Sequence, residues 1–139
     1  MDVEPDRIIF TKTTGNIQSQ LKIGVDPEED VEIRQLTLTN LGDRPCTLEV
    51  TSFLEPVLAA KAAFQAHPAF NKLFLQTEAV ESASALLAYR RTGDPDPSPW
   101  LVHALQVDVP TIGSLEYETE RTRFVGRGRS YRLPVVIET

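Results

Sequence analysis

The stretch Asn16-Ile17-Gln18-Ser19-Gln20-Leu21-Lys22-Ile23-Gly24-Val25 alternates between two kinds of residue. Its odd-numbered positions are mostly apolar, whereas its even-numbered positions are mostly polar. This period of two predicts a β-strand with one face towards a core and the other towards water. The run 26–30 that follows contains proline and acidic residues, which suit a turn better than a strand interior. The stretch therefore predicts one strand of an antiparallel hairpin.

The same reasoning predicts further short strands on both sides of this one. Residues 31–39 carry apolar side chains on both faces, which favours a more central strand. Within 56–70, an alanine-rich run predicts a turn or two of helix inside a long connection. The expected strands are 7–12, 17–25, 31–39, 46–55, 73–79, 85–91, 100–109, 114–119 and 131–137, and 92–99 is an expected loop.

Eight or nine short strands without alternating helices favour an all-β fold, an antiparallel sandwich, over a parallel α/β fold. The 139 residues suit a single domain, 1–139. The net charge of −6 argues against binding to nucleic acid, because phosphate neutralisation needs a basic surface. The chain shows no run of 18 apolar residues and no signal-peptide pattern at its start, so we expect a cytoplasmic segment without membrane contact.

The residue types in the sequence do not indicate a metal site, a cofactor site or a catalytic centre. The single Cys46 and the two histidines cannot supply a cysteine- or histidine-rich metal site, so no metal and no cofactor is expected. Glycoside hydrolysis needs two carboxylates held across a cleft. The acidic run 28–30 is most simply a solvated turn, and Glu116, Glu118 and Glu120 alternate along one expected strand face. No catalytic pair is therefore assigned.

Each of the two histidines allows two interpretations. His103 lies in the apolar row of its strand. It is either a functional residue, as a general base or sugar contact, or a buried neutral residue hydrogen-bonded to backbone. The buried neutral residue is favoured. His67 lies in the connection 56–70, and loop residues often carry function, but a structural role is again favoured. A platform for stacking sugars is another option for the aromatic residues, although most of them are expected in the core. They include Trp100, Tyr89, Tyr117 and Tyr131.

The segment 121–129 holds the one local excess of positive charge. Its glycine spacing is not that of a phosphate-binding loop. Pairing with acidic side chains of the same chain, or docking to another domain, is favoured over binding of phosphate or nucleic acid. Arginine suits such pairing because its planar guanidinium group can engage carboxylates and stack on rings.

Three blocks of sequence resemble one known family. They are VDPEEDVEIR at 25–34 with LTLTN at 36–40, LEVTSFLEPVL at 48–58 with AHPAFNKLF at 66–74, and YETERTRFVGRGR at 117–129. Together they resemble the N-terminal β-sandwich of glycoside hydrolase family 94, formerly glycosyltransferase family 36. Within that family they are most similar to the phosphorylase-like region of cyclic β-1,2-glucan synthases. The blocks follow the family's order and cover nearly the whole chain.

The resemblance implies a super-sandwich of the galactose-mutarotase-like kind. In the family this domain precedes an (α/α)6 barrel that holds the general acid and binds phosphate, and the 139 residues are expected to hold the sandwich without that barrel. The chain is therefore expected to be a fragment of a larger glycosyltransferase or glycoside phosphorylase. Whether that parent protein is attached to the inner membrane stays open. The expected role is an accessory carbohydrate-binding and structural module that has no turnover by itself.

The resemblance also implies the partners and the contact residues. The expected partners are a β-linked glucan, the catalytic barrel of the parent chain and a second copy in a homodimer. The segments 56–72 and 121–129 are the expected contacts with sugar or barrel. Their candidate residues are His67, Phe70, Asn71, Arg121, Arg123, Arg127 and Arg129. Two alternatives stay open, namely a docking or dimerisation module without sugar affinity and, more remotely, a stand-alone mutarotase.

Overall fold

The computed structural model describes residues 1–91 and 99–138. Two compact units make up the chain, Met1–Thr51 and Ser52–Thr139, and each is described by itself. The expected loop 92–99 lies almost wholly outside the described residues. None of the described helices is both long and apolar enough to cross a membrane.

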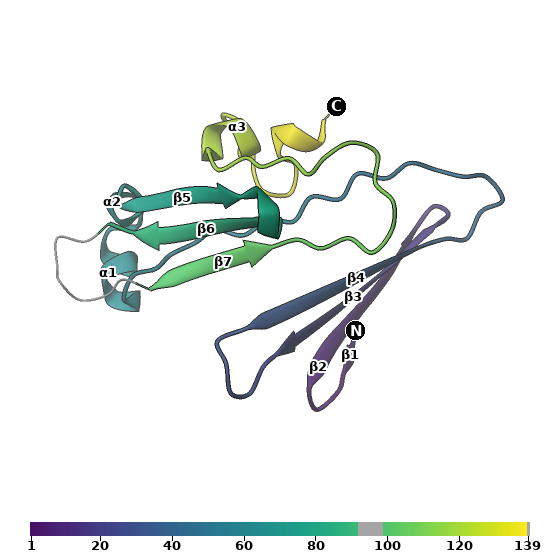
Figure 1. The fold of residues 1–139 in the computed structure, drawn as a ribbon, viewed down its shortest axis with the longest axis horizontal. Coiled ribbons are helices and arrows are strands. Elements are labelled where there is room, and N and C mark those ends of the chain that lie inside the picture. Colours follow the sequence, from purple (N-terminus) through teal and green to yellow (C-terminus); the bar gives the residue numbers. More distant parts are fainter. Residues whose placement is uncertain (92–98, 139) are drawn as a thin grey trace. The chain divides into compact units, whose positions relative to one another are not determined.

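The first unit is an antiparallel meander. Its strands follow one another in the order β1-β2-β3-β4, so each pairs with its neighbour in sequence (Figure 1). The turn between β2 and β3 passes through Gly15, whose φ of 57° lies in the left-handed region. Glycine adopts that region without steric cost. The strands are β1 (Asp2–Val3), β2 (Arg7–Thr14), β3 (Ile17–Val25) and β4 (Glu32–Asn40).

The alternating stretch 17–25 is the interior strand of this sheet, as its pattern predicts. β3 pairs along its whole length with both β2 and β4, and its residues are half-buried from Ile17 to Gly24. The expectation of a central strand at 31–39 is wrong, because β4 lies at the end of the described sheet and all of its residues are exposed. The reason is that 46–55, expected to be a strand, has no strand pairing.

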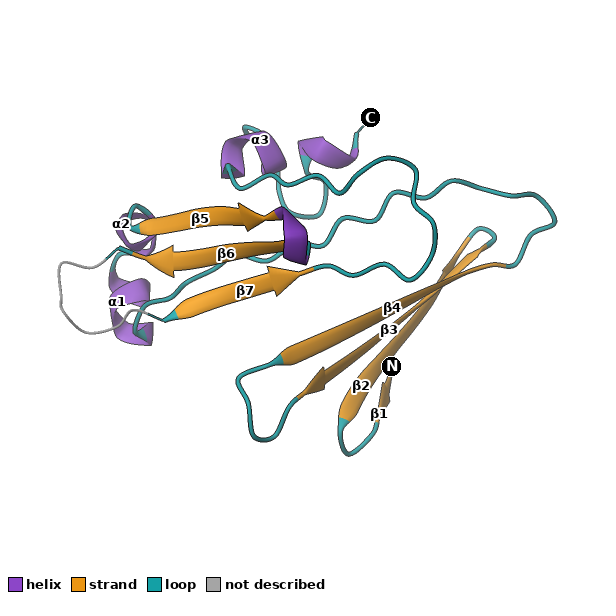
Figure 2. Ribbon diagram, viewed as in Figure 1, coloured by secondary structure: helices purple, strands orange, loops and turns teal. Residues whose placement is uncertain are grey.

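The second unit contains a three-stranded antiparallel sheet in the order β5-β6-β7, accompanied by short helices (Figure 2). The first helix before the sheet, α1, confirms the helical turn predicted for the alanine-rich run within 56–70. The second, α2, begins at Pro68, where the predicted helix is expected to end, and is not predicted from the sequence. The elements are α1 (Lys61–Ala66), α2 (Pro68–Lys72), β5 (Leu75–Val80), β6 (Ala85–Arg90), β7 (Trp100–Ala104) and α3 (Arg121–Val125), with 3-10 turns at Glu81–Ala83 and Val135–Ile137.

The later strand predictions fail in part. β7 ends at Ala104 instead of continuing to residue 109, and 114–119 forms no strand. The expected strand 131–137 contains Pro134, which cannot donate a ladder hydrogen bond, and the structure places a 3-10 turn directly after it. The all-β class is nevertheless confirmed, because both sheets are antiparallel and every helix is short. Among the described residues, the buried apolar side chains are Ala85, Ala88 and Val125.

Candidate functional site

The two segments that the sequence singles out meet at one carboxylate in the second unit. Glu55 accepts a hydrogen bond through Oε1 from Nζ of Lys72, the last residue of α2. The same Oε1 accepts a hydrogen bond from the hydroxyl of Tyr131 at 2.8 Å. Arg121, the first residue of α3, donates through Nε to that hydroxyl at 2.9 Å and lies 3.8 Å from Oε1. We call Glu55, Lys72, Arg121 and Tyr131 the Glu55 cluster.

The electrostatics of the Glu55 cluster favour the ionised carboxylate. Partial burial by itself raises the pKa of Glu55. The hydrogen bonds from Lys72 and Tyr131, together with the charges of Lys72 and Arg121, outweigh this effect and hold the pKa below its ordinary value. The hydrogen bond to Tyr131 raises the pKa of Arg121. Glu55 is thus an anion at neutral pH, which suits an acceptor of hydrogen bonds and not a general acid.

Aromatic rings support this cluster from one side. The ring of Phe53 stacks on Phe124 with centroids 4.9 Å apart and lies 5.0 Å from the ring of Tyr131. The guanidinium carbon of Arg121 lies 5.1 Å from the centroid of Tyr131, within the range of a cation–π contact. The rings and the ion pairs therefore hold together the chain around residue 55, the end of α2 and the C-terminal segment.

The predicted residues of the first segment form a helical corner. Asn71 is buried, at 6% exposed, and its side-chain amide donates to the carbonyl oxygens of Ala63 at 2.8 Å and His67 at 2.9 Å. His67 joins α1 to α2, and its carbonyl oxygen takes part in this corner. Phe70 is exposed, and its ring packs edge-on against Phe74. Asn71 is therefore a residue that fixes the corner, and Phe70 presents an aromatic surface beside it.

The predicted arginines mostly pair with acidic side chains of the same unit. Arg123 lies 3.0 Å from Glu120, and Arg129 pairs with Glu138. Arg127 is exposed and forms no ion pair within 1–91 and 99–138. Of the alternatives for segment 121–129, internal pairing accounts for most of its charge.

His103 and the alternating glutamates differ from expectation. His103 is half-buried, not buried, and its Nε2 lies 2.8 Å from Oγ of Ser52. Glu118 and Glu120 do not lie on a strand; Oε1 of Glu118 accepts a hydrogen bond from the backbone N–H of Glu120 at 2.7 Å. This bond satisfies the backbone N–H of Glu120, the residue directly before α3, which has no partner within the helix. Glu118 therefore stabilises the N-terminus of α3.

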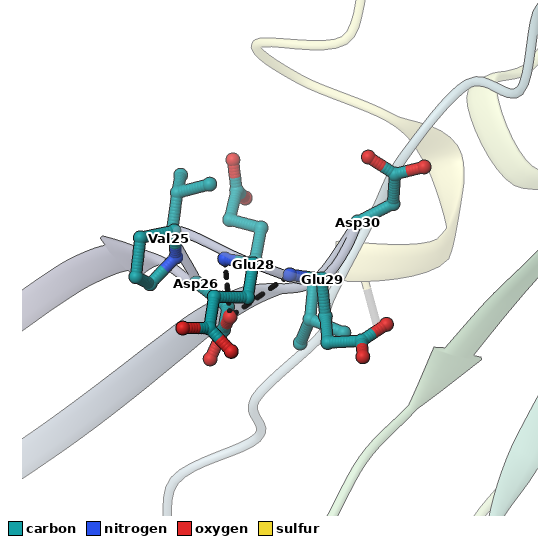
Figure 3. Close-up of a pocket in the computed structure, with 8 residues that line it drawn as sticks. Val25, Asp26, Glu28, Glu29 and Asp30 are labelled. Carbon is teal, nitrogen blue, oxygen red and sulfur yellow. Dashed lines mark hydrogen bonds between the residues drawn. The ribbon is translucent and has the colours of Figure 1, made fainter.

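The acidic turn between β3 and β4 is ordered by its own backbone. Oδ1 of Asp26 accepts hydrogen bonds from the N–H groups of Glu28 and Glu29, each at 2.9 Å, and the carboxylate of Asp30 points away from them (Figure 3). These two bonds lower the pKa of Asp26. A hollow lined by residues 25–32 lies at this turn. Within the described part of the chain, no three His, Cys, Asp or Glu side chains are grouped so that they could hold a metal ion.

Comparison with known proteins decides the family. The family model for "Glycosyl hydrolase 94, supersandwich domain" matches residues 2–139. The chain belongs to this family. The supersandwich chain is also 36% identical over 126 residues to "Cyclic beta-(1,2)-glucan synthase NdvB" from Rhizobium meliloti (strain 1021). That match covers 90% of the supersandwich chain but only 4% of the relative, so the chain spans a small part of that protein's length.

Sequence reasoning about the supersandwich chain does not find the centre of its polar cluster. Glu55 and Lys72 both lie inside the quoted blocks, but neither is singled out there, and Tyr131 is considered only as an aromatic. A glutamate followed directly by proline at the start of a long connection is the one local signal near Glu55. Nothing in the local pattern connects it to Tyr131, because 76 positions separate the two residues.

Proposed function

We propose that this domain is an accessory carbohydrate-binding and structural module of a glucan phosphorylase or cyclic β-1,2-glucan synthase, without turnover of its own. The observation that carries the proposal is the Glu55 cluster, which brings the end of α2 and the start of α3 to one carboxylate. The resemblance to the family implies contacts with sugar or the catalytic barrel for the segments 56–72 and 121–129. Membership of the family and the name of the similar glucan synthase supply the substrate class.

The chemistry of the Glu55 cluster supports a role in binding more than in bond cleavage. Glycoside hydrolysis needs a second carboxylate across the cleft, one of the two with a raised pKa. In the described part of the chain the contacts of Glu55 are two cations and a phenol, and its pKa is lowered. A fixed anion beside arginine, lysine and aromatic rings resembles the polar and aromatic lining of sugar sites.

The test is an NMR titration of the 15N-labelled chain with β-1,2-glucooligosaccharides. We expect localised amide shifts within 56–74 or 121–129, and no phosphorolysis or hydrolysis of the same oligosaccharides. Turnover by the pure chain would contradict the accessory role. Cellulose-derived β-1,4-oligosaccharides of equal length serve as the control for linkage.

A second candidate is a docking or dimerisation module that has no sugar affinity. It is favoured by the way in which Glu55 and its donors satisfy one another, since paired groups need no ligand. The candidate partners are the catalytic barrel of the parent and a second copy of the chain. A titration without any amide shift, combined with a dimer in analytical ultracentrifugation, would favour this candidate over sugar binding.

A further inference from the structure

A pair of stacked aromatic rings lies on the sheet of the second unit, away from the Glu55 cluster in sequence. Tyr89 on β6 and Trp100 on β7 are directly opposed in the antiparallel register. Their ring centroids lie 4.4 Å apart with 26° between the ring planes. Trp100 is 58% exposed, although a tryptophan usually buries more apolar surface than almost any other side chain. The stacked pair therefore presents an open aromatic surface on this sheet.

Polar side chains continue the same face of the sheet. Gln76 on β5 opposes Tyr89, so Gln76, Tyr89 and Trp100 form one row across the three strands. The row spans about 10 Å, because adjacent strands lie roughly 4.8 Å apart. Two residues further along, Glu78 begins the next row of that face, which continues through Leu87. Within the described residues, Gln76 and Glu78 form no side-chain hydrogen bond or ion pair and are exposed.

The opposite face of this sheet is occupied by the unit's own residues. Arg90 donates to the carbonyl oxygen of Asn71 at 3.1 Å, and its guanidinium carbon lies 5.1 Å from the ring centroid of Phe74. His103 lies within hydrogen-bonding distance of Ser52. Side chains alternate between faces along a strand, so these contacts leave Tyr89 and Trp100 on the other face.

We infer that the row Gln76-Tyr89-Trp100 is a binding platform for a neutral oligosaccharide of pyranose rings, a claim that rests on the proposed carbohydrate-binding function. The flat C–H face of a β-linked glucose ring stacks on an aromatic face, while its hydroxyl groups need donors and acceptors at the edge. The amide of Gln76 supplies both kinds of group and the carboxylate of Glu78 supplies acceptors. The two rows hold one carboxylate, Glu78, and Arg91 follows two residues beyond Tyr89 along the same face. The face therefore carries no excess of positive charge that would select a polyanion.

Trp100 is the only tryptophan in the chain, so its fluorescence reports on this platform alone. We expect titration with a β-1,2-glucooligosaccharide to shift Trp100 emission to the blue and to protect it from quenching by acrylamide. The dissociation constant from fluorescence is expected to agree with that from the NMR titration. Both readouts use the unaltered 139-residue chain and so do not depend on the folding of a variant.

Substitutions at Trp100 and Gln76 measure how much each side chain contributes to sugar binding. Trp100→Ala is expected to weaken sugar binding about tenfold or more, as for the loss of a central aromatic anchor, whereas Trp100→Phe retains part of the affinity. Gln76→Ala is expected to weaken binding severalfold through its lost hydrogen bonds. Ile112→Ala removes an exposed apolar side chain elsewhere in the same unit and is expected to leave binding unchanged. Circular dichroism verifies that each variant is folded.

The outcomes separate this inference from the proposed function. Amide shifts around the Glu55 cluster without any change in Trp100 emission would overturn the platform and leave the proposed function standing. The absence of both signals at millimolar sugar would overturn both. Shifts within β5, β6 and β7 together with a blue shift of Trp100 emission in the unaltered chain, and weaker sugar binding by Trp100→Ala in the NMR titration, would support the platform.

Discussion

The hydroxyl of Tyr131 donates a 2.8 Å hydrogen bond to Oε1 of Glu55, across 76 positions of the chain. It also accepts a hydrogen bond from Nε of Arg121 at 2.9 Å, so one phenol oxygen links an anion to a cation. The ring of the same tyrosine lies beside Phe53. Tyr131 thus joins the C-terminal segment to the chain around residue 55 by a polar contact and an apolar contact.

Removing the hydroxyl separates these two contributions. We expect Tyr131→Phe to lower the free energy of unfolding by about 1 kcal/mol, because the ring stays but Glu55 and Arg121 lose their bridge. Tyr131→Leu should cost about 1 kcal/mol more, because it also removes the ring contact with Phe53. Urea denaturation followed by circular dichroism measures both. Tyr117→Phe is the control, since no hydrogen bond of its hydroxyl occurs in the described part of the chain, and equal losses in both Phe variants would contradict the bridge.

The depressed pKa of Glu55 predicts a dependence of stability on pH. A carboxyl whose pKa is lower in the folded chain stabilises the fold above its unfolded pKa and loses that contribution as the pH falls through its folded pKa. The window therefore lies below the ordinary value of 4.5. The contribution at neutral pH is about 0.5–1 kcal/mol, since the Glu55 side chain is 36% exposed and solvent screens its ion pairs.

Glu55→Gln isolates this contribution from that of other carboxylates. We expect the variant to be less stable than the unaltered chain at pH 7 and the difference in unfolding free energy to shrink as the pH falls below 4.5. Urea denaturation at a series of pH values measures the difference. Glu116→Gln removes an exposed carboxylate that has no ion pair among the described residues, and it serves as the matched control for the loss of one negative charge. A constant difference across the acid range would contradict the depressed pKa.

The predictions from sequence succeed where contacts are local. Alternation over 17–25 predicts β3 with the bounds that the structure gives, and the helical turn predicted from the alanine-rich run appears as α1. Strands 46–55 and 114–119 fail although their patterns are similar, because a strand also needs a partner for its backbone groups and the pattern does not reveal one. The Glu55 cluster could not be predicted either, because its members lie far apart in the sequence and local patterns do not show which distant side chains meet.

Asn71 fixes the corner between α1 and α2 through its side-chain amide. We expect Asn71→Ala to cost about 1–3 kcal/mol, because the carbonyl oxygens of Ala63 and His67 lose their donor in a largely buried place. Asn71→Asp keeps the size of the side chain but cannot donate when ionised, so it should cost at least as much. Hydrogen exchange should rise within α1 and α2 and stay unchanged in β2 and β3. Native-like protection of the helices in Asn71→Asp would contradict this role.

Two glycines near the end of α3 form a matched pair. Gly126 has φ 89° and ψ 160°, a conformation almost restricted to glycine. A Cβ added there would lie 3.1 Å from Cδ of Arg129 and 3.2 Å from Cβ of Val135. We expect Gly126→Ala to cost about 1–3 kcal/mol. Gly128 has φ 71° and open space around it, so Gly128→Ala should cost about 1–2 kcal/mol. Thermal denaturation compares the two, and a larger loss in Gly128→Ala would contradict the crowding at Gly126.

The order of the strands has a consequence for how the chain folds while it is being made. In the sheet β1–β4 every strand pairs with its neighbour in sequence, so all its ladders can close once residue 40 has left the ribosome. The carboxylate of Glu55 finds the phenol of Tyr131 only after a further stretch of nascent chain has emerged. We therefore expect the N-terminal hairpins to pair during translation, while the segment around Glu55 stays open to chaperones and proteases until Tyr131 has emerged.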